Sequence, residues 1–538
     1  MASRRDELNA YAFAKRRLVA QFLRPSPSGS EEGAPRPLRA VLPGLLAGVV
    51  VLAGFGVWGM FRPVAPKDWD EPYGHVIVAS GSTTRYVVLT TKGEHRLHPV
   101  LNMASARLLV DVDDNRSQVI KVDDAVLDNG ELPRGATVGI PYAPDRVPDA
   151  AEVAKPKLWA ACERAEQGGR AVQTAVFVLT AHDGARLDET YRLRGGQLLY
   201  VESAAAGHQR YVVDAEGTKY PISSANSVLL AQVAGVGRVP QRVSQEWLAT
   251  LHEGNEIVSP VLPEKPGGLS RVPGLPVAGK RVGSVLRVAG DTYFLVLRDR
   301  AARVSPFTAS LLLNSRPAAA AGLPAGPVDT GITFPPGAWF RPYAKWPEHS
   351  PGPRSVNSPH PAKGHRNTVC NVLRSVHGSH GTTTLSTWAG PEFPRPLATG
   401  AGSAYVTPGS GQYFRQISGT QTGAGPYFLV TDAGLRHSLQ AGTHSAPGDA
   451  AHRDGPYPTG PVDTGSAATG STRTDSAGTG SADAEGGTQR EARQPLKTAR
   501  ELLGYERVEA APIPSVWSSL LPTGPRLSTG AAVQLQGP

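Results

Sequence analysis

Hydrophobic and polar residues alternate in four short stretches of this chain, and the four stretches share one layout. The clearest copies are "RYVVLTTKGEHRLHPV" at 85–100 and "RYVVDAEGTKYPI" at 210–222, and weaker copies lie at 291–313 and 425–439. Each copy has a short alternating strand, a turn that contains Gly or Asp, and a second, more polar strand. This pattern is typical of a β-hairpin.

The segments around each hairpin predict a helix after it and a strand before it. In the first three copies a Pro lies at the strand exit, and a start rich in Ser, Thr or Asn leads into a short run with paired Leu residues, as at the beginning of a helix. A ββα module of roughly 40 residues buries little surface alone, so the modules should pack against neighbours or a larger core. Their unequal spacing excludes a simple solenoid. The strands expected before the hairpins are at 74–80, 196–203, 283–290 and 411–418.

The longest apolar run is "AVLPGLLAGVVVLAGFGVWGMF" at 40–61. Its length of about 22 residues without a charge is enough to cross a hydrocarbon layer of roughly 30 Å. Pro43 falls in the first turn, where a missing N–H is tolerated, and Trp58 falls near the far end, where an indole suits the interface. The run is too long and begins too late for a signal peptide. The sequence therefore predicts a transmembrane helix at 39–61.

The charges on either side of this run predict its orientation. Eight Arg and Lys residues precede it, whereas the charges just after it nearly cancel. By the positive-inside rule the N-terminus is cytoplasmic, and the bulk of the chain is extracytoplasmic. Residues 1–38 are expected to hold an amphipathic helix with a basic face that Pro25 ends. Two interpretations fit its spacing: a topogenic segment at the lipid headgroups, or a docking helix for a cytoplasmic or membrane partner. The candidate docking residues are Lys15, Arg16, Arg17 and Phe22.

Cys162 and Cys370 are the two cysteines of the chain, and both lie in the part assigned outside the membrane. An oxidising exterior favours a disulfide between them. Such a bond would join distant segments and stabilise the fold by about 3 to 5 kcal/mol in the chain-entropy model. Two thiols at this separation, without a Cys-x-x-Cys pair or an ordered His cluster, fall short of a ligand set, so no metal site is predicted.

Composition and charge bear on how much of the chain can be ordered and on whether it binds nucleic acid. Gly (60) and Pro (48) make up about a fifth of the 538 residues, so much of the chain must be turn, linker or disordered tract. The formal charge of +9 comes from scattered basic residues that do not alternate with aromatic ones, so nucleic-acid binding is not expected. Residues 441–497 lack apolar side chains almost entirely, which predicts disorder.

The intervals between the modules complete the predicted organisation. "LWAACERAEQ" and "TAVFVLTA" could pair with the apolar stretch after Cys370, and the disulfide would tie them into one β-rich central domain. The fold class is therefore α+β: one transmembrane helix, followed by an elongated extracytoplasmic region of four modules around the central domain. The expected ranges are 1–38 for the cytoplasmic helix, 39–61 for the span, 70–112, 193–240 and 280–314 for modules 1 to 3, 405–440 with 498–538 for module 4 and the C-terminal tail, 113–192 and 367–404 for the central domain, 315–366 for a Pro-rich loop and 441–497 for the insertion.

The order of these features resembles the EccB family, the single-span membrane subunit of the type VII (ESX) secretion apparatus of actinobacteria. The resemblance covers almost the whole chain and departs from the family at 441–497 and in the Pro-rich stretch before Cys370. It implies a core-complex subunit that dimerises and helps to assemble a hexameric pore complex, with an FtsK-like motor ATPase and a mycosin protease among its partners. The segments that carry it are "LNAYAFAKRRLVAQFLR", "HPVLNMASARLL", "LWAACE", "PGSGQYFRQ", "YFLVTDAGLRHSL" and "PIPSVWSSLLPTGPRLSTGAA".

Members of this family are also described as ATPases, which directs attention to "GLPVAGKR" at 274–281. Gly274, Gly279 and Lys280 satisfy the first part of a phosphate-binding loop, but Arg281 stands where a Ser or Thr hydroxyl should ligate Mg²⁺. The flanking sequence is Pro-rich, and a strand is expected where a phosphate-binding helix should begin. We therefore expect a linker into the third module, with no catalytic set and no cofactor.

Three functions from different classes fit these observations. The first is a structural and assembly subunit of the secretion complex, supported by the anchor, the repeated modules and the lack of a catalytic motif. The second is an extracytoplasmic ATP hydrolase, for which ATP would be the cofactor and Lys280 the residue to test. The third is a cell-wall-binding module, which β-rich repeats with Gly and Pro loops could also serve.

Overall fold

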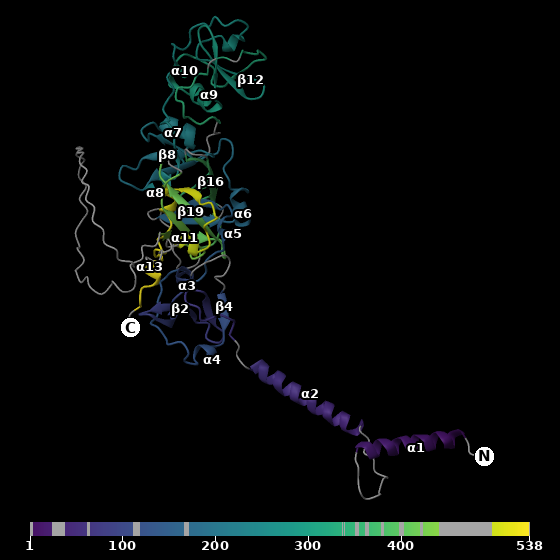
Figure 1. Cartoon of the computed structure of the whole chain (residues 1–538). Helices are drawn as coiled ribbons and strands as arrows, with labels where there is room; N and C mark the ends of the chain where they lie inside the picture. The colour runs from purple at the N-terminus through teal and green to yellow at the C-terminus, as the bar shows by residue number, and fades with distance from the viewer. Residues whose placement is uncertain are drawn as a thin grey trace, which may run out of the picture. The chain divides into compact units, whose positions relative to one another are not determined.

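The structure is a computed structural model (Figure 1) that describes residues 4–23, 38–61, 65–110, 119–165, 172–335, 337, 339–349, 355–360, 365–377, 381–397, 403–419, 423–440 and 498–536. Within these ranges the chain forms two N-terminal helices, five β-sheets and a set of short helices. The predicted disordered insertion at 441–497 lies outside the described residues.

Two helices make up the N-terminal part. α1 covers Arg4–Leu23, ends just before Pro25 and has no buried residue. α2 covers Leu38–Phe61 and contains Pro43. Across the residues that the structure describes, no helix combines the length and hydropathy needed to cross a membrane, so the transmembrane helix at 39–61 stays a prediction.

Four of the sheets are built from a three-stranded unit, one or two short helices and a returning strand. The first has β1 (Val76–Ala79), β2 (Arg85–Thr91), β3 (Glu94–Val100), α3 (Met103–Leu109) and β4 (Val119–Val122), with α4 (Asp124–Leu127) after it. The second has β7 (Leu199–Ser203), β8 (Arg210–Val213), β9 (Thr218–Ile222), α7 (Ser227–Ala234) and β10 (Gln241–Val243), with α8 (Gln245–Ala249) and β11 (His252–Glu253) after it. The third has β12 (Val285–Val288), β13 (Thr292–Val296), β14 (Ala301–Val304), α9 (Pro306–Leu313), α10 (Arg316–Ala320) and β15 (Val328–Asp329). The fourth has β19 (Gly411–Ile417), β20 (Tyr427–Thr431), β21 (Arg436–Leu439), α11 (Ala499–Leu502) and β22 (Ala511–Pro514), with α12 (Ser515–Ser518) and α13 (Thr529–Ala532) after it.

These four sheets share one strand order. Three consecutive strands form an antiparallel meander, and the returning strand lies on the open side of the first one. In three sheets the returning strand is parallel to the first strand: β10 to β7, β15 to β12 and β22 to β19. A parallel neighbour cannot be reached by a tight turn and needs a crossover. The helix expected after each hairpin is this crossover.

The returning strands of the first three sheets lie outside the ranges expected for modules 1 to 3. β4 falls in the range given to the central domain, β10 begins just after 240, and β15 and α10 fall in the range 315–366 given as a Pro-rich loop. At the other end of the chain, β18 (Ala404–Val406) pairs with a central strand, so the fourth module begins after it. The returning strands are too short to show a period-two pattern, which is why the sequence did not indicate them.

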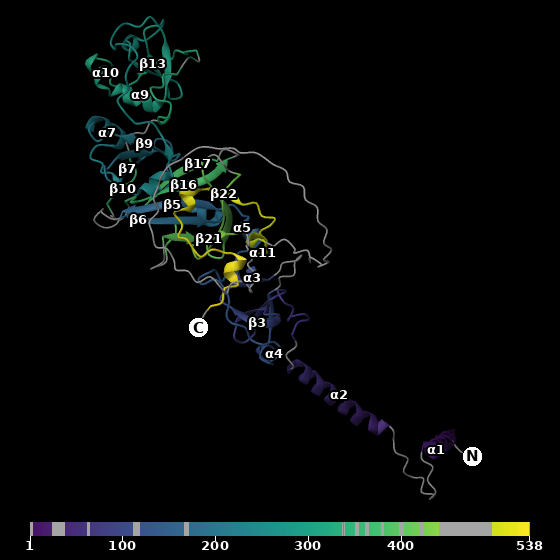
Figure 2. The same cartoon turned by 60° about the vertical axis from the view of Figure 1, so that its left-hand side comes forward.

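The fifth, central sheet joins segments that lie far apart in the sequence. Its order is β17-β16-β5-β6-β18, and the labels of β17, β16, β5 and β6 can be followed in Figure 2. β16 pairs antiparallel with β5 in a register that sets Cys370 opposite Cys162. The stretch after Cys370 therefore pairs with "LWAACE", as expected. The strands not yet bounded are β5 (Leu158–Ala165), β6 (Val172–Leu179), β16 (Thr368–His377) and β17 (Thr382–Gly390), and short helices α5 (Ala150–Val153) and α6 (Ala181–Gly184) flank β5 and β6.

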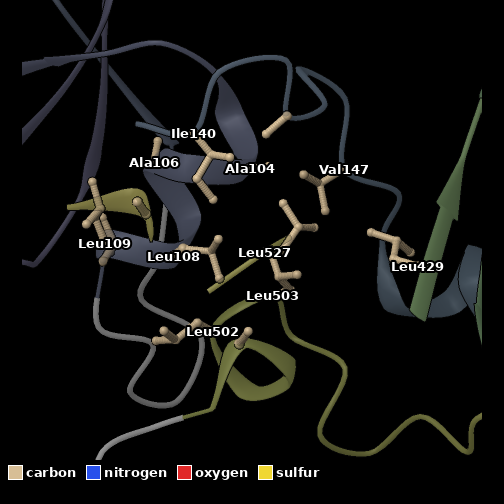
Figure 3. Packing of buried hydrophobic residues seen from close by; sticks show 14 of the residues in the cluster. Ala104, Ala106, Leu108, Leu109, Ile140, Val147, Leu429, Leu502, Leu503 and Leu527 are labelled. Atoms are coloured by element: carbon tan, nitrogen blue, oxygen red, sulfur yellow. The ribbon is translucent and has the colours of Figure 1, made fainter. Parts of the chain in front are cut away.

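The first and fourth sheets share one hydrophobic core. Leu108 and Leu109 of α3 lie in the same buried cluster as Leu502 and Leu503 at α11, and Figure 3 shows these side chains close together. The hydroxyl of Tyr505 donates a hydrogen bond to the Pro148 carbonyl at 2.6 Å, and the Tyr505 side chain is fully buried. The two ends of the sheet-rich part of the chain are therefore packed into one unit, although more than 300 residues separate them.

In three of the repeated sheets, a buried aromatic side chain packs against a glycine from a later part of the chain. Leu97, Lys219 and Arg436 on the third strands each accept a hydrogen bond, at 2.9 Å, from the N–H of a glycine further along the chain. The next residue on each strand is aromatic, and its ring fills the space that a Cβ on the glycine would occupy. A larger residue than glycine would force this ring out of place. The three pairs are His98 with Gly135, Tyr220 with Gly254 and His437 with Gly524.

Candidate functional site

One face of the central sheet is the place where the second and fourth sheets meet. A single buried cluster contains Trp159 and Val178 of the central strands, Val201 of the second sheet and Phe414 of the fourth. Because a shared core resists sliding and separation, this arrangement holds three sheets as one body. We call the five residues that carry its polar contacts the central joint: Trp159, Glu163, Ser244, Trp247 and Gln412.

Trp159 fastens the fourth sheet to the central one. Its Nε1–H donates a hydrogen bond to Gln412 Oε1 at 2.7 Å, and both side chains are buried. Its ring meets Phe414 edge to face, with 5.5 Å between the ring centroids. Alternation along β19 places Gln412 and Phe414 on the same face of that strand, so one tryptophan contacts both residues.

Trp247 fastens the second sheet to the same strand. Its Nε1–H donates to the Ala161 carbonyl at 2.9 Å, and the side chain is fully buried. Trp247 lies in α8, whose N-cap is Ser244. The helix therefore presents a ring and a cap to β5 together.

Glu163 is the charged member of the central joint, and none of its surface is exposed to solvent. Burial raises the pKa of Glu163, while hydrogen bonds from Ser244 and Thr174 act in the opposite direction. Its oxygens accept bonds from the Ser244 N–H at 2.8 Å, from the Thr174 hydroxyl at 3.0 Å and from the Ser244 hydroxyl. Three donors from two elements satisfy a carboxyl group that water does not reach. The final Glu of "LWAACE" is thus a structural anchor for α8.

The other face of the central sheet carries the disulfide. Cys162 and Cys370 are bonded and both fully buried, in a cluster that includes Phe177 and Trp388. The bond lies between paired strands, where the β5 and β16 backbones are already neighbours. It therefore closes a loop of 208 residues without adding a new contact between domains.

The second and third sheets meet through their helices. Gln232 of α7 donates to the Ser310 carbonyl of α9 at 2.7 Å. Phe307 of α9 packs edge to face on Trp346, with 5.7 Å between ring centroids, in a cluster that contains Leu229 and Val233 of α7. This contact is smaller than the core around the central joint and includes no disulfide.

The candidate docking residues of the N-terminal helix all lie on α1. Lys15, Arg16, Arg17 and Phe22 are exposed, and the Phe22 side chain is 89% exposed. An aromatic side chain this exposed suits a surface that another molecule or a lipid headgroup layer covers.

The segment that resembles a phosphate-binding loop has a different geometry. Val277–Gly279 form a single 3₁₀ turn, Arg281 bridges to Leu269, and the chain then enters strand β12. Gly279 is buried, and a Cβ on it would lie 2.6 Å from Leu286 of that strand. Gly279 therefore allows Leu286 to pack closely against this turn. No helix N-terminus follows Lys280 in residues 281–304, all of which the structure describes.

Sequence reasoning missed the central joint as a site. "LWAACE" and "PGSGQYFRQ" contain Trp159, Glu163 and Gln412, but neither segment predicts that the other is its partner. A Glu within an apolar strand was the available signal, because a charged side chain is rarely fully buried without partners. In the described part of the chain, no group of three or more His, Cys, Asp or Glu side chains could hold a metal ion.

We expect His437 to make the stability of the fourth sheet depend on pH. Its Nδ1–H donates to the Pro525 carbonyl at 3.0 Å, its Nε2 has no partner and its side chain is 1% exposed. Burial lowers the pKa of His437, and the Pro525 bond partly opposes this. Below a pH of about 6.5 the unfolded imidazole takes up a proton that the folded one resists. The contribution of neutral, buried His437 to the free energy of unfolding is therefore complete above that pH and is lost as the pH falls.

A glutamine at this position can donate to Pro525 and does not titrate. We expect the difference in melting temperature between wild type and H437Q to be constant from pH 8 to 7 and to shift in favour of H437Q as the pH falls to 5. Exposed His360 provides the control, because H360Q should leave the wild-type profile unchanged. Parallel profiles for H437Q and wild type would show that His437 does not contribute to the pH dependence.

Comparison with known proteins gives a consistent set of matches. A family model described as type VII secretion system ESX-1, transport TM domain B, matches residues 1–537. The ESX-3 secretion system ATPase EccB3 of Mycolicibacterium smegmatis is 28% identical over 425 residues, covering 74% of this chain and 75% of that protein. The ESX-5 secretion system ATPase EccB5 of Mycobacterium tuberculosis is 28% identical over 327 residues, covering 58% and 59% of the two chains.

Two solved structures have a similar fold. A chain of an intact ESX-5 inner membrane complex matches with a TM-score of 0.52 and 21% identity, covering 100% of this chain and 96% of that one. A chain of an EccB3 dimer from the ESX-3 core complex matches with a TM-score of 0.50 and 21% identity, covering 85% and 99%. At these identities the likeness shows a shared mixed α/β, sheet-rich fold.

Proposed function

This chain belongs to the EccB family of type VII secretion systems, and on that premise we propose that it is a structural and assembly subunit of a secretion complex in the cell membrane. The observation that carries the proposal is the central joint. It fastens the second and fourth sheets to one face of a sheet whose other face holds a buried disulfide. A well-packed core of this kind resists deformation, which suits a subunit that holds other components in place.

The proposed topology has one membrane span, with a cytoplasmic N-terminus and an extracytoplasmic β-rich part. Its support is the uncharged run at 40–61, which α2 covers, and the excess of Arg and Lys before it. The disulfide agrees with an oxidising exterior. In this topology α1 lies on the cytoplasmic side, and Lys15, Arg16, Arg17 and Phe22 are its proposed docking residues.

The proposed partners are the other membrane components of the system. The matched solved chains come from an inner membrane complex and from a dimer, and we extend both arrangements to this chain: a dimer within a hexameric complex. An FtsK-like motor ATPase and a mycosin protease are the further partners that family membership favours.

The test is extraction of the tagged full chain in mild detergent, followed by native gel and mass spectrometry, with a variant lacking residues 1–38 beside it. A complex above about a megadalton that contains the motor ATPase supports the proposal, and its loss in the truncated variant assigns docking to α1. Purification of the full chain alone, as a small species, contradicts the proposal. Sedimentation of such a species with purified peptidoglycan would then support a cell-wall-binding module.

A second candidate function is ATP hydrolysis, since the relatives EccB3 and EccB5 are named as ATPases. Under that alternative ATP is the substrate, and K280A should abolish hydrolysis by the purified full chain. K265A is the matched control, since Lys265 is an exposed lysine outside the G-x-x-x-x-G-K segment. The geometry of the 274–281 segment predicts the same rate for both variants and for wild type.

A further inference from the structure

The third sheet and its loops have a strongly positive net charge. Residues 262–346 contain eleven Lys and Arg against four Asp and Glu, a net charge of +7 out of +9 for the whole chain. Arg287, in strand β12, is paired with Asp329 at 2.7 Å. Most of the other cations in this range are exposed, so a polyanion approaching this region meets little competing negative charge.

Six of these cations gather where three segments meet. Ser270 donates its N–H to the Lys280 carbonyl at 2.8 Å and its hydroxyl to the Leu297 carbonyl at 2.7 Å, and Val282 donates to the Gly268 carbonyl at 2.8 Å. A two-stranded ribbon, closed by the bridge between Leu269 and Arg281, therefore lies against the turn between β13 and β14. We define the basic patch as the exposed residues Lys265, Leu269, Arg271, Val277, Lys280, Arg281, Arg298 and Arg300.

Two acidic side chains lie within the basic patch. Asp299 is 3.5 Å from the Arg271 guanidinium, and the Glu264 carboxylate accepts a bond from the Arg298 backbone N–H at 2.7 Å. Six cations against these two acids leave a local charge of about +4, which an anionic surface would complement.

The basic patch also exposes two large aliphatic side chains. Val277 is 87% exposed and Leu269 is 77% exposed. Between them Leu275 is 4% exposed, in a cluster with Leu286, and Gly279 lies against Leu286 as well. The loop is therefore held by its own core contacts in a conformation that keeps Val277 outside, so little ordering is needed when a partner binds.

We infer that the basic patch docks on an anionic lipid surface, with Val277 and Leu269 entering the headgroup layer and the six cations above the phosphates. Exposed aliphatic side chains surrounded by Lys and Arg are the combination that binds such surfaces, because apolar insertion and charge attraction add. The cations lie on three separate segments around an open ribbon, a distribution that suits a laterally extended surface better than a single acidic side chain. The G-x-x-x-x-G-K segment thus shapes a lipid contact.

The test uses the full chain in nanodiscs of phosphatidylcholine, which cover α2, mixed with separate vesicles. Flotation measures binding to vesicles of phosphatidylcholine alone and to vesicles with about 30% phosphatidylglycerol. We expect binding to the anionic vesicles only, weakened by salt. K265E/K280E should reduce it about 20-fold or more, and V277S about threefold or more.

Two matched variants carry the same changes elsewhere. R186E/R238E alters the net charge equally at two exposed arginines, and V236S removes a valine that is 89% exposed. The binding of each control variant to the anionic vesicles should be within about twofold of that of wild type. Equal binding to both kinds of vesicle, no binding, or equal losses in the patch and control variants would overturn the proposal. Capture of the chain by immobilised polyglutamate without vesicle binding would also overturn it and would point to an acidic protein instead.

Discussion

The C162A/C370A variant is expected to unfold with a free energy about 5 kcal/mol lower than that of wild type. The disulfide closes a loop of 208 residues, and in the chain-entropy model a loop of this length destabilises the unfolded state by about that amount. Chemical denaturation followed by tryptophan fluorescence will measure the change, because Trp159 and Trp388 lie in the central sheet. The folded structure should be retained, since the two strands still pair in full.

The control for this result is wild type denatured in the presence of a strong reductant. Both samples then have an open unfolded chain, so their unfolding midpoints should agree apart from the lost sulfur atoms. Midpoints of wild type that are the same with and without reductant would contradict an entropic role for the bond.

The second large effect is expected from W159A. This substitution removes a fully buried ring, its contact with Phe414 and its hydrogen bond to Gln412. Truncation of a buried tryptophan costs about 3 to 5 kcal/mol. Because the lost contacts lie between the central and fourth sheets, hydrogen exchange should rise in β19 and β20 more than in β12 and β13.

Two further variants serve as comparisons. The first distinguishes the contribution of the Trp159 ring from that of its hydrogen bond, and the second compares a buried tryptophan with an exposed one. W159F keeps an aromatic ring but leaves Gln412 Oε1 without its donor, at a cost of about 1 to 3 kcal/mol. W339A truncates a tryptophan that is 42% exposed and packed on Arg303 and Arg341, and should change stability by about 1 kcal/mol or less. An effect of W159A no larger than that of W339A would contradict the role given to the central joint.

The second and third sheets are held by contacts of different size, and this difference bears on function. The second sheet is fastened to the central sheet by Trp247 and Ser244, whereas the third sheet is joined to the second mainly through Gln232 and the ring of Phe307. The third sheet, which carries the basic patch, is therefore held by the smaller of these two contacts. A contact with lipid at that position would add a restraint where the protein itself supplies little.

Local pattern was enough to predict the hairpins, the crossover helices and the pairing of the two cysteines. Period-two alternation depends on neighbouring residues, and the caps are local too: Asn102, Asn226 and Ser305 each accept a bond from a backbone N–H in the first turn of their helices. The disulfide needed only two cysteines and an oxidising exterior. The same local reasoning predicts that Arg281 does not replace the Mg²⁺ ligand of a phosphate-binding loop.

What the amino-acid sequence determined by itself was thus the type and order of most elements and the family of the chain. The tertiary structure alone decided which elements meet: the returning strands β10 and β15, the Trp159 contact with Gln412, the burial of Glu163 under α8 and the packing of rings on Gly135, Gly254 and Gly524. The physical reason is the sequence separation between the interacting residues. Hairpins and caps are specified by residues a few positions apart, whereas a buried polar group is satisfied by partners 81 or 253 residues away, which only the folded chain brings together.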